Sequence, residues 1–207
     1  MSEASDDGGF LALWDWRRRV AALYAEVRAE RDPAAAWRRW RETRDALFRT
    51  HPQSPLDAEQ RAHFKGLDYG DYDPALRFAV DLVPISSTRP RRVDAGNDGT
   101  LTLTGFARTQ GLSARLGGEL TVYWIEGYAG GVFLPLRDRS TGVTSYSGGR
   151  YLLDTMKGAD LGSDAQGRTI LDFNFAYNPS CAYTPRWICP LAPAENTLSV
   201  AIEGGER

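Results

Sequence analysis

Cysteine, histidine and long apolar runs are all scarce in this sequence. It has two cysteines and two histidines among 207 residues, which excludes the disulfide framework of a small secreted domain. No apolar run approaches the roughly 20 residues that a membrane-spanning helix needs, and residues 1–9 lack the basic and apolar regions of a secretory signal peptide. We therefore expect a soluble, cytoplasmic protein with reduced thiols and no membrane contact.

The balance of charge and the apolar content narrow the class of protein further. With 25 basic and 27 acidic residues the formal net charge is -2, which argues against a dedicated nucleic-acid binder. Apolar residues make up 42% of the chain, too many for a disordered or collagen-like chain. At this length a single core can remove about 70% of the unfolded surface from water. We expect one globular unit that binds no nucleic acid.

Helical periodicity marks the N-terminal part of the chain. Between positions 10 and 50, apolar side chains recur at spacings of three and four residues, so they share one helix face. Asp32 followed by Pro33 predicts the start of a second helix, because aspartate accepts from free backbone N–H groups and proline has none to satisfy. A third, short helix is predicted from a serine cap at Ser54 to about Phe64.

From residue 76 onward the apolar period changes from 3.6 to 2, as Phe78, Val80 and Leu82 show. The turn residues Asn97-Asp98-Gly99 predict a hairpin between strands at 91–95 and 101–104. Further strands are expected at 106–110, 119–126, 132–136, 143–146, 150–154, 169–175 and 198–202.

Short strands separated by glycine-rich turns are typical of a sandwich or a partly closed barrel. We predict an α+β fold in which N-terminal helices precede a mainly antiparallel β-barrel or sandwich. The expected organisation is a disordered tail at 1–9, a helical segment at 10–66 packed on the core, and a β-rich domain at 67–207, together one globular unit.

Arginines and tryptophans interleave on the predicted helices. The residues are Arg17, Arg18, Arg19, Arg38, Arg39, Arg41 and Arg44, with Trp14, Trp16, Trp37 and Trp40. This pattern has two interpretations. One is an RNA-binding surface, in which aromatic rings stack on bases; the other is a solvated helix face with the tryptophans in the core. The net negative charge favours the second interpretation.

The two cysteines, Cys181 and Cys189, are eight positions apart in a proline-rich segment. Structural zinc sites usually contain cysteine pairs about two to four residues apart, so this spacing does not match. A disulfide, a zinc site completed by a histidine, and a nucleophilic Cys181 remain alternatives to inert thiols. Inert thiols are favoured because cytosolic cysteines stay reduced, and we expect no metal.

Motifs of the common catalytic classes are absent from the sequence. It contains no G-x-S-x-G nucleophile elbow, no His-Glu-x-x-His, and no Walker or Rossmann glycine pattern. The residues alone therefore name neither a reaction nor a cofactor.

The segment 169–196 is the most informative part of the chain. Phe173 and its apolar neighbours alternate with Asp172 and Asn174, as on the two faces of a strand. A long loop rich in aromatic residues and proline follows, and a stiff loop of this kind either lines a pocket or closes the end of a barrel.

This segment resembles the family known as domain of unknown function 1684, whose members are uncharacterised bacterial and archaeal proteins. The matching runs are Leu171-Asp172-Phe173-Asn174, Ala176-Tyr177-Asn178-Pro179, Cys181-Ala182-Tyr183, Cys189-Pro190 and Glu195-Asn196, with Ser54-Pro55-Leu56, Phe64-Lys65-Gly66-Leu67, Phe133-Leu134-Pro135, Gly149-Arg150-Tyr151 and Gly205-Glu206 elsewhere. Ser180 and Thr184 depart from the family pattern. The resemblance covers about residues 50–207 and implies the location of a site without implying a reaction.

Our first hypothesis is a small-molecule-binding β-domain with its pocket near the loop at 172–196. Arg150 would hold an anionic group, Asn174 would bind the polar edge of the ligand, and Tyr183 would help to cover it. The predicted ligand-binding residues are Arg150, Tyr151, Asn174, Asn178, Tyr183, Trp187 and Cys189.

The alternative is a hydrolase or transferase. Asp172 or Glu195 would act as a general base, or Cys181 as a nucleophile, because carboxylates near a sheltered aromatic loop can acquire raised pKa values. A third hypothesis is an interaction module that docks a partner on its tryptophan-rich helices. The ligand, the cofactor and the oligomeric state do not follow from the sequence.

Overall fold

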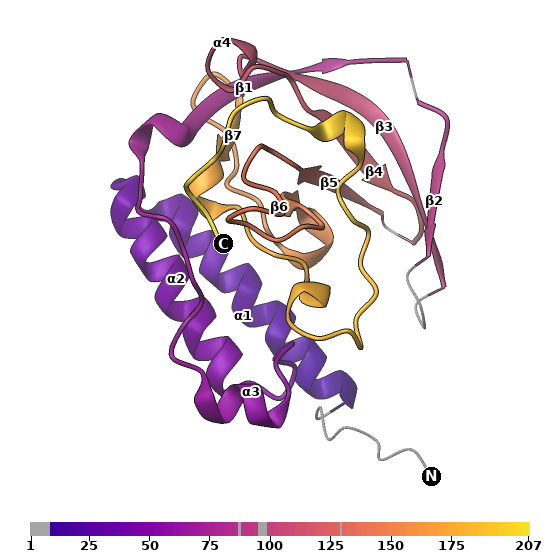
Figure 1. Cartoon of the computed structure of the whole chain (residues 1–207). Helices are drawn as coiled ribbons and strands as arrows, with labels where there is room; N and C mark the ends of the chain where they lie inside the picture. The colour runs from indigo at the N-terminus through magenta and orange to yellow at the C-terminus, as the bar shows by residue number, and fades with distance from the viewer. Residues whose placement is uncertain (1–8, 87, 95–98, 129) are drawn as a thin grey trace.

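A computed structural model describes residues 9–86, 88–94, 99–128 and 130–207. Two long helices, α1 (Gly9–Ala29) and α2 (Pro33–Thr50), lie side by side along the sheet (Figure 1). The predicted start of α2 is confirmed, because the Asp32 side chain accepts a hydrogen bond from the backbone N–H of Ala34 at 3.0 Å. The predicted tail lies almost entirely outside the described residues. No helix in the described part of the chain is long and apolar enough to cross a membrane.

The third helix, α3 (Ala58–His63), begins later than the sequence predicted. Its cap is Asp57, which accepts from the backbone N–H of Gln60 at 2.8 Å, while the Gln60 side chain accepts from the Asp57 backbone at 2.9 Å. The Ser54 hydroxyl instead donates to the carbonyl of Phe48 at 2.7 Å. It also accepts from the backbone N–H of Leu56 at 3.2 Å. The predicted serine cap was wrong because the helix begins only at Ala58, which puts Asp57 and not Ser54 at the cap position.

In the described part of the chain, seven strands follow the helices. They are β1 (Arg77–Pro84), β2 (Arg91–Asp94), β3 (Thr100–Gln110), β4 (Thr121–Ile125), β5 (Gly131–Leu136), β6 (Arg150–Asp154) and β7 (Thr169–Asp172). The short helices are α4 (Ser113–Leu116), η1 (Pro74–Leu76), η3 (Thr155–Lys157), η4 (Phe173–Phe175), η5 (Ser180–Ala182) and η6 (Ala194–Asn196).

The strands form one curved sheet in the order β6-β5-β4-β3-β1-β7, with β2 also paired to β3, and every pairing is antiparallel. The backbones of Tyr151 in β6 and Tyr177 just after β7 exchange two hydrogen bonds, of 2.8 and 3.0 Å. They link the two ends of the sheet. The predicted fold class is confirmed: N-terminal helices precede a nearly closed, six-strand antiparallel barrel.

The hairpin prediction is confirmed by the antiparallel pairing of β2 with β3. Two of its turn residues, Asn97 and Asp98, lie outside the described residues. The strands predicted at 101–104 and 106–110 are one strand, β3, with a register shift between Gly105 and Ala107. An extra residue of this kind bends a strand without ending it.

Three other strand predictions need correction. Residues 143–146 form a turn, in which the carbonyl of Ser140 accepts three consecutive backbone N–H groups. Residues 198–202 form no strand: the chain bends at positions 199 and 200, and the hydrogen bonds of this segment to other backbone groups go to Arg137, Leu116 and Arg139. The segment at 169–175 leaves the sheet after Asp172, whose side chain accepts from the backbone N–H of Asn174 at 3.0 Å and caps η4.

Two clusters of buried apolar side chains lie on opposite faces of the strands. Neighbouring residues Val122 and Tyr123 belong one to each cluster, as the alternation of a strand requires. The cluster that contains Tyr123 also includes Trp37 and Trp40, which are 6% and 0% exposed, so α1 and α2 cover this face. Trp14, at the start of α1, is 58% exposed. The tryptophans of α2 are therefore core residues.

Candidate functional site

The end of the chain turns inward between the helices and the barrel. At Gly205 φ is +79°, and a Cβ there would lie 2.8 and 2.9 Å from the carbonyl oxygens of Phe173 and Ala176, so only glycine fits. The next backbone N–H, that of Glu206, donates to the carbonyl of Ala176 at 2.8 Å. This path leaves the Glu206 carboxylate buried, with 1% of the residue exposed.

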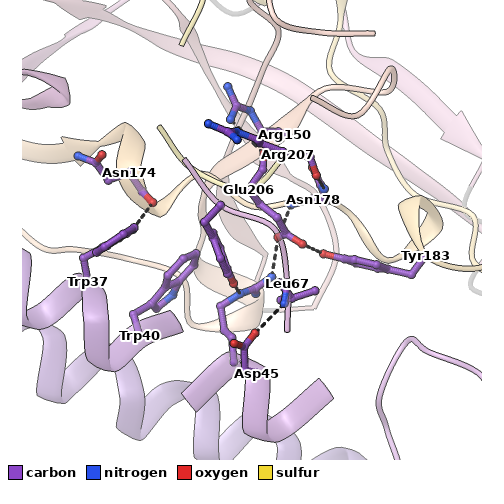
Figure 2. A network of polar contacts seen from close by, with 12 residues as sticks. Trp37, Trp40, Asp45, Leu67, Arg150, Asn174, Asn178, Tyr183, Glu206 and Arg207 are labelled. Carbon is purple, nitrogen blue, oxygen red and sulfur yellow. Dashed lines mark hydrogen bonds and ion pairs between the residues drawn. The ribbon is translucent and has the colours of Figure 1, made fainter. Parts of the chain in front are cut away.

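Glu206 is the centre of a polar network (Figure 2). Its carboxylate pairs with Arg44 of α2 at 2.8 Å, and it accepts hydrogen bonds from the Tyr183 hydroxyl and from the backbone N–H of Asn178 at 3.0 Å. Arg44 also donates to the Tyr69 hydroxyl at 3.0 Å. Burial raises the pKa of Glu206, while Arg44 and the hydrogen bonds oppose that rise. The network ties α2, the loop after β7 and the C-terminus together.

A cavity of about 190 Å³ lies beside this network, between α1, the end of α2 and the segment 177–187. Its lining residues are Leu13, Trp16, Arg17, Val20, Tyr24, Arg44, Phe48, Gln53, Pro55, Lys157, Ala159, Tyr177, Asn178, Pro179, Ser180, Tyr183 and Trp187. Most of the wall is apolar or aromatic. Three of these residues are basic and none is acidic, so the charge at the cavity is positive.

Three buried polar atoms belong to residues of this cavity. They are the Tyr177 hydroxyl, Oδ1 of Asn178 and Nε1 of Trp187, and none has a hydrogen-bond partner within the described part of the chain. A buried polar atom without a partner costs about 1–3 kcal/mol, so such atoms are rare and usually have a reason. The other two such atoms in the described residues, Nε of Arg150 and Oδ2 of Asp172, belong to residues outside this lining.

Of the predicted ligand-binding residues, Asn178, Tyr183 and Trp187 line this cavity, whereas Arg150 and Tyr151 have contacts elsewhere. Arg150 is 1% exposed, and its guanidinium donates to Asp138 at 2.8 Å, to the Ser140 hydroxyl at 3.5 Å, and to the carbonyls of Gly204 at 2.7 Å, Ile202 at 3.0 Å and Glu206 at 3.1 Å. It therefore clamps the C-terminal segment against the barrel. The anion-binding role of Arg150 stays a prediction.

Tyr151 and Asn174 also make contacts within the protein. The Tyr151 hydroxyl donates to the carbonyl of Pro190 at 2.7 Å. The Asn174 side chain donates to Oδ1 of Asp172 and to the carbonyl of Asp73, both at 2.8 Å, and accepts from the Asp73 backbone N–H at 2.9 Å. The bonds of Asn174 hold the segment before β1 against the segment after β7.

The three predicted catalytic residues occupy three different settings. Asp172 is buried beside Asn174, and burial raises the pKa of its carboxyl against the effect of those hydrogen bonds. Glu195 is on the surface, where it pairs with Arg91 at 3.1 Å. Cys181 is half-buried, with its Sγ 3.6 Å from the hydroxyl of Tyr146. Their catalytic roles stay predictions.

Cys181 and Cys189 are both free and half-buried. The interaction between the two thiols lowers the pKa of Cys181 and raises that of Cys189. No disulfide joins them, and whether the thiols are inert, as the sequence favoured, stays a prediction. Within the ranges that the structure describes, no three His, Cys, Asp or Glu side chains are close enough to hold a metal ion.

Sequence reasoning missed several residues of the site, above all Arg44 and Glu206. From the sequence, Glu206 was named only as part of a motif shared with the family, and Arg44 was named only as one of the arginines on the predicted helices. These two side chains are 162 positions apart. The Gly205-Glu206 pair was the available signal, since a glycine beside a carboxylate permits a tight turn into the interior.

The fold and the cavity define a helix-covered antiparallel barrel with a small, positively charged cavity at its C-terminal seam. Residues 62–207 match the family described as protein of unknown function, DUF1684. The chain belongs to this family, as the resemblance predicted.

One solved structure is similar over most of its length. It is the solution NMR structure of an uncharacterised protein from Haloarcula marismortui, which is 33% identical to this chain. The match covers 81% of this chain and 90% of that chain, with a TM-score of 0.55. No curated protein matches the chain.

Proposed function

We propose that this protein binds a small organic anion with an apolar body in the cavity between α1 and the segment 177–187. One observation carries the proposal: three buried polar atoms that have no partner among the described residues, on Tyr177, Asn178 and Trp187, belong to residues that line one cavity. A ligand that reaches them would recover part of the cost of their burial.

The charge of the lining residues supports an anion. Arg17 is exposed on α1 and has no ion pair within the described ranges, whereas Lys157 is 3.6 Å from Asp154 and Arg44 is paired with Glu206. The net positive charge at the cavity therefore comes mainly from Arg17. A carboxylate accepts hydrogen bonds from N–H and O–H donors, which Trp187 and Tyr177 possess.

The size and the walls support a small, partly apolar ligand. Typical sites for drug-sized molecules measure roughly 300–1,000 Å³, whereas this cavity measures about 190 Å³. Trp16, Val20 and Phe48 contribute apolar surface. A short aliphatic or single-ring carboxylate is the matching class. In this proposal the predicted ligand-binding residues Arg150, Tyr151 and Asn174 support the surrounding structure.

Binding of single-ring and short-chain carboxylates, compared with their neutral amides, tests the proposal by ligand-observed NMR and by the thermal unfolding midpoint. We expect the carboxylates to bind more tightly than the amides. Arg17→Gln should weaken carboxylate binding about tenfold or more, as expected for the loss of a charge-assisted contact. Trp187→Phe, which keeps a ring and removes the N–H, should weaken it as well.

Arg18→Gln is the matched control, because Arg18 is an exposed neighbour that does not line the cavity. It should leave binding unchanged. The proposal fails if neither the carboxylates nor the amides bind, or if Arg17→Gln and Arg18→Gln bind the carboxylates equally well.

A further inference from the structure

The loop between Cys181 and Cys189 is anchored at both ends. Cys181 lies in η5, where the backbone N–H of Tyr183 donates to the carbonyl of Ser180 at 3.1 Å. Beyond Cys189, the carbonyl of Pro190 accepts from the Tyr151 hydroxyl of β6 at 2.7 Å. The Tyr146 hydroxyl is 3.6 Å from Sγ of Cys181, and the backbone N–H of Ala192 donates to the carbonyl of Gly148 at 3.2 Å. Both ends of the loop therefore contact the segment 146–151, which brings the two cysteines near each other.

The groups around the two sulfurs favour a thiolate at Cys181. The Cys189 thiol donates a hydrogen bond to it, and the Tyr146 hydroxyl lies 3.6 Å from its Sγ. Lys157 and Tyr151 are the other titratable groups that act on the pair. The hydrogen bond from Cys189 lowers the pKa of Cys181 to about 6, against the effect of burial, and the same contact raises the pKa of Cys189.

We propose that Cys181 and Cys189 form a redox-active dithiol, in which Cys181 attacks a low-molecular-weight disulfide and Cys189 closes the protein disulfide. In the first step the Cys181 thiolate forms a bond to one sulfur of the small disulfide, and the other sulfur leaves as a thiolate. In the second step Cys189 loses its proton and attacks Sγ of Cys181, which releases the second small thiolate. The protein loses two protons and two electrons, and the small disulfide becomes two thiols.

The eight-position spacing connects this chemistry to the cavity. Tyr183 and Trp187 lie between the two cysteines and both line the cavity. A disulfide would restrict the conformations of that wall and so change ligand affinity. Only this consequence rests on the proposed function, since the oxidation itself requires no ligand.

Incubation of the whole protein with oxidised glutathione at neutral pH, followed by acid quenching, thiol labelling and intact-mass measurement, tests the proposal. The wild type should lose the mass of two hydrogens and both labelling sites, and dithiothreitol should restore them. Cys189→Ser should stop at a glutathione adduct on Cys181, because no second thiol displaces it. Cys181→Ser should react at least about tenfold more slowly, since the thiol with the lowered pKa is gone and burial still raises the pKa of Cys189.

The wild-type measurement stands without the variants, and far-UV circular dichroism shows whether each variant is folded. Accumulation of a stable glutathione adduct on the wild type would overturn the proposal, as would no reaction at all. Equal adduct formation by the two serine variants would overturn the assigned order of attack. If oxidation left the carboxylate affinity unchanged, the link to the cavity would be refuted, while the oxidation itself would still support the redox role of the two cysteines.

Discussion

Replacement of Arg150 by methionine should destabilise the protein more than any surface substitution. Methionine keeps the length and apolar stem of the side chain while removing its charge and donors. The change leaves Asp138, whose side chain is 0% exposed, without its ion pair, and leaves the carbonyls of Gly204 and Ile202 each without a hydrogen bond from the guanidinium.

The expected cost follows from these contacts. Removing one partner of a buried ion pair costs about 3–5 kcal/mol, and the carbonyls that lose a donor can only add to it. Against a total stability of about 5–15 kcal/mol, this is a large fraction. The free energy of unfolding falls by about 2 kcal/mol per molar urea, so the urea midpoint of unfolding should fall by about 1.5–2.5 M.

Urea titration followed by far-UV circular dichroism and tryptophan fluorescence measures this cost. Arg168→Met is the matched control, because its ion pair with Asp164 is on the surface and worth at most about 1 kcal/mol. Combining Arg150→Met with Asp138→Asn should recover part of the loss, since no unpaired carboxylate remains buried. A stability of Arg150→Met within about 1 kcal/mol of wild type would refute the clamp and favour the anion-binding role instead.

Three further predictions concern a turn, a cap and a thiol. Gly205→Ala should cost about 2 kcal/mol more than Gly167→Ala in urea titration, since both have positive φ but only position 205 has carbonyl oxygens in the way. Asp57→Ala should cost about 1 kcal/mol, because the backbone N–H of Gln60 loses its acceptor. The alkylation rate of Cys181 should rise with pH through a midpoint near 6, because the thiolate is the nucleophile and its pKa is lowered.

Each of these has an opposing outcome. Equal losses for the two glycine variants would show that the backbone at position 205 adapts. A wild-type midpoint for Asp57→Ala would show that water replaces the cap. Alkylation with a midpoint near 8.5, the pKa of an ordinary thiol, would show that the pKa of Cys181 is not lowered. The pH profile is more informative than the rate, because a thiolate of lower pKa is also a weaker nucleophile.

Local signals predicted most of the elements. The start of α2 follows from Asp32 and Pro33, which act within a single turn, and β6 follows from a short apolar run. Predictions failed where a side chain had a distant partner or a competing local one. Asp57, three residues after Ser54, caps α3, while the Ser54 hydroxyl binds the end of α2. Asp172 ends β7 by capping η4.

The candidate site was predictable only in part. The aromatic loop suggested Asn178, Tyr183 and Trp187, and these three residues line the cavity. Arg44 and Glu206 were not predicted as a pair, because nothing local in either segment indicates a partner across most of the chain. Arg150 was predicted beside a ligand because a buried arginine and a binding arginine have the same sequence pattern.

The sequence by itself determined the start of α2, the change from helical to strand periodicity and the family, because each depends on residues close together in the chain or on runs in a fixed order. Only the tertiary structure decided which polar groups are buried, which of them lack partners and where the cavity lies. Those properties depend on side chains brought together from distant segments, as when Gly205 turns the end of the chain so that Glu206 meets Arg44.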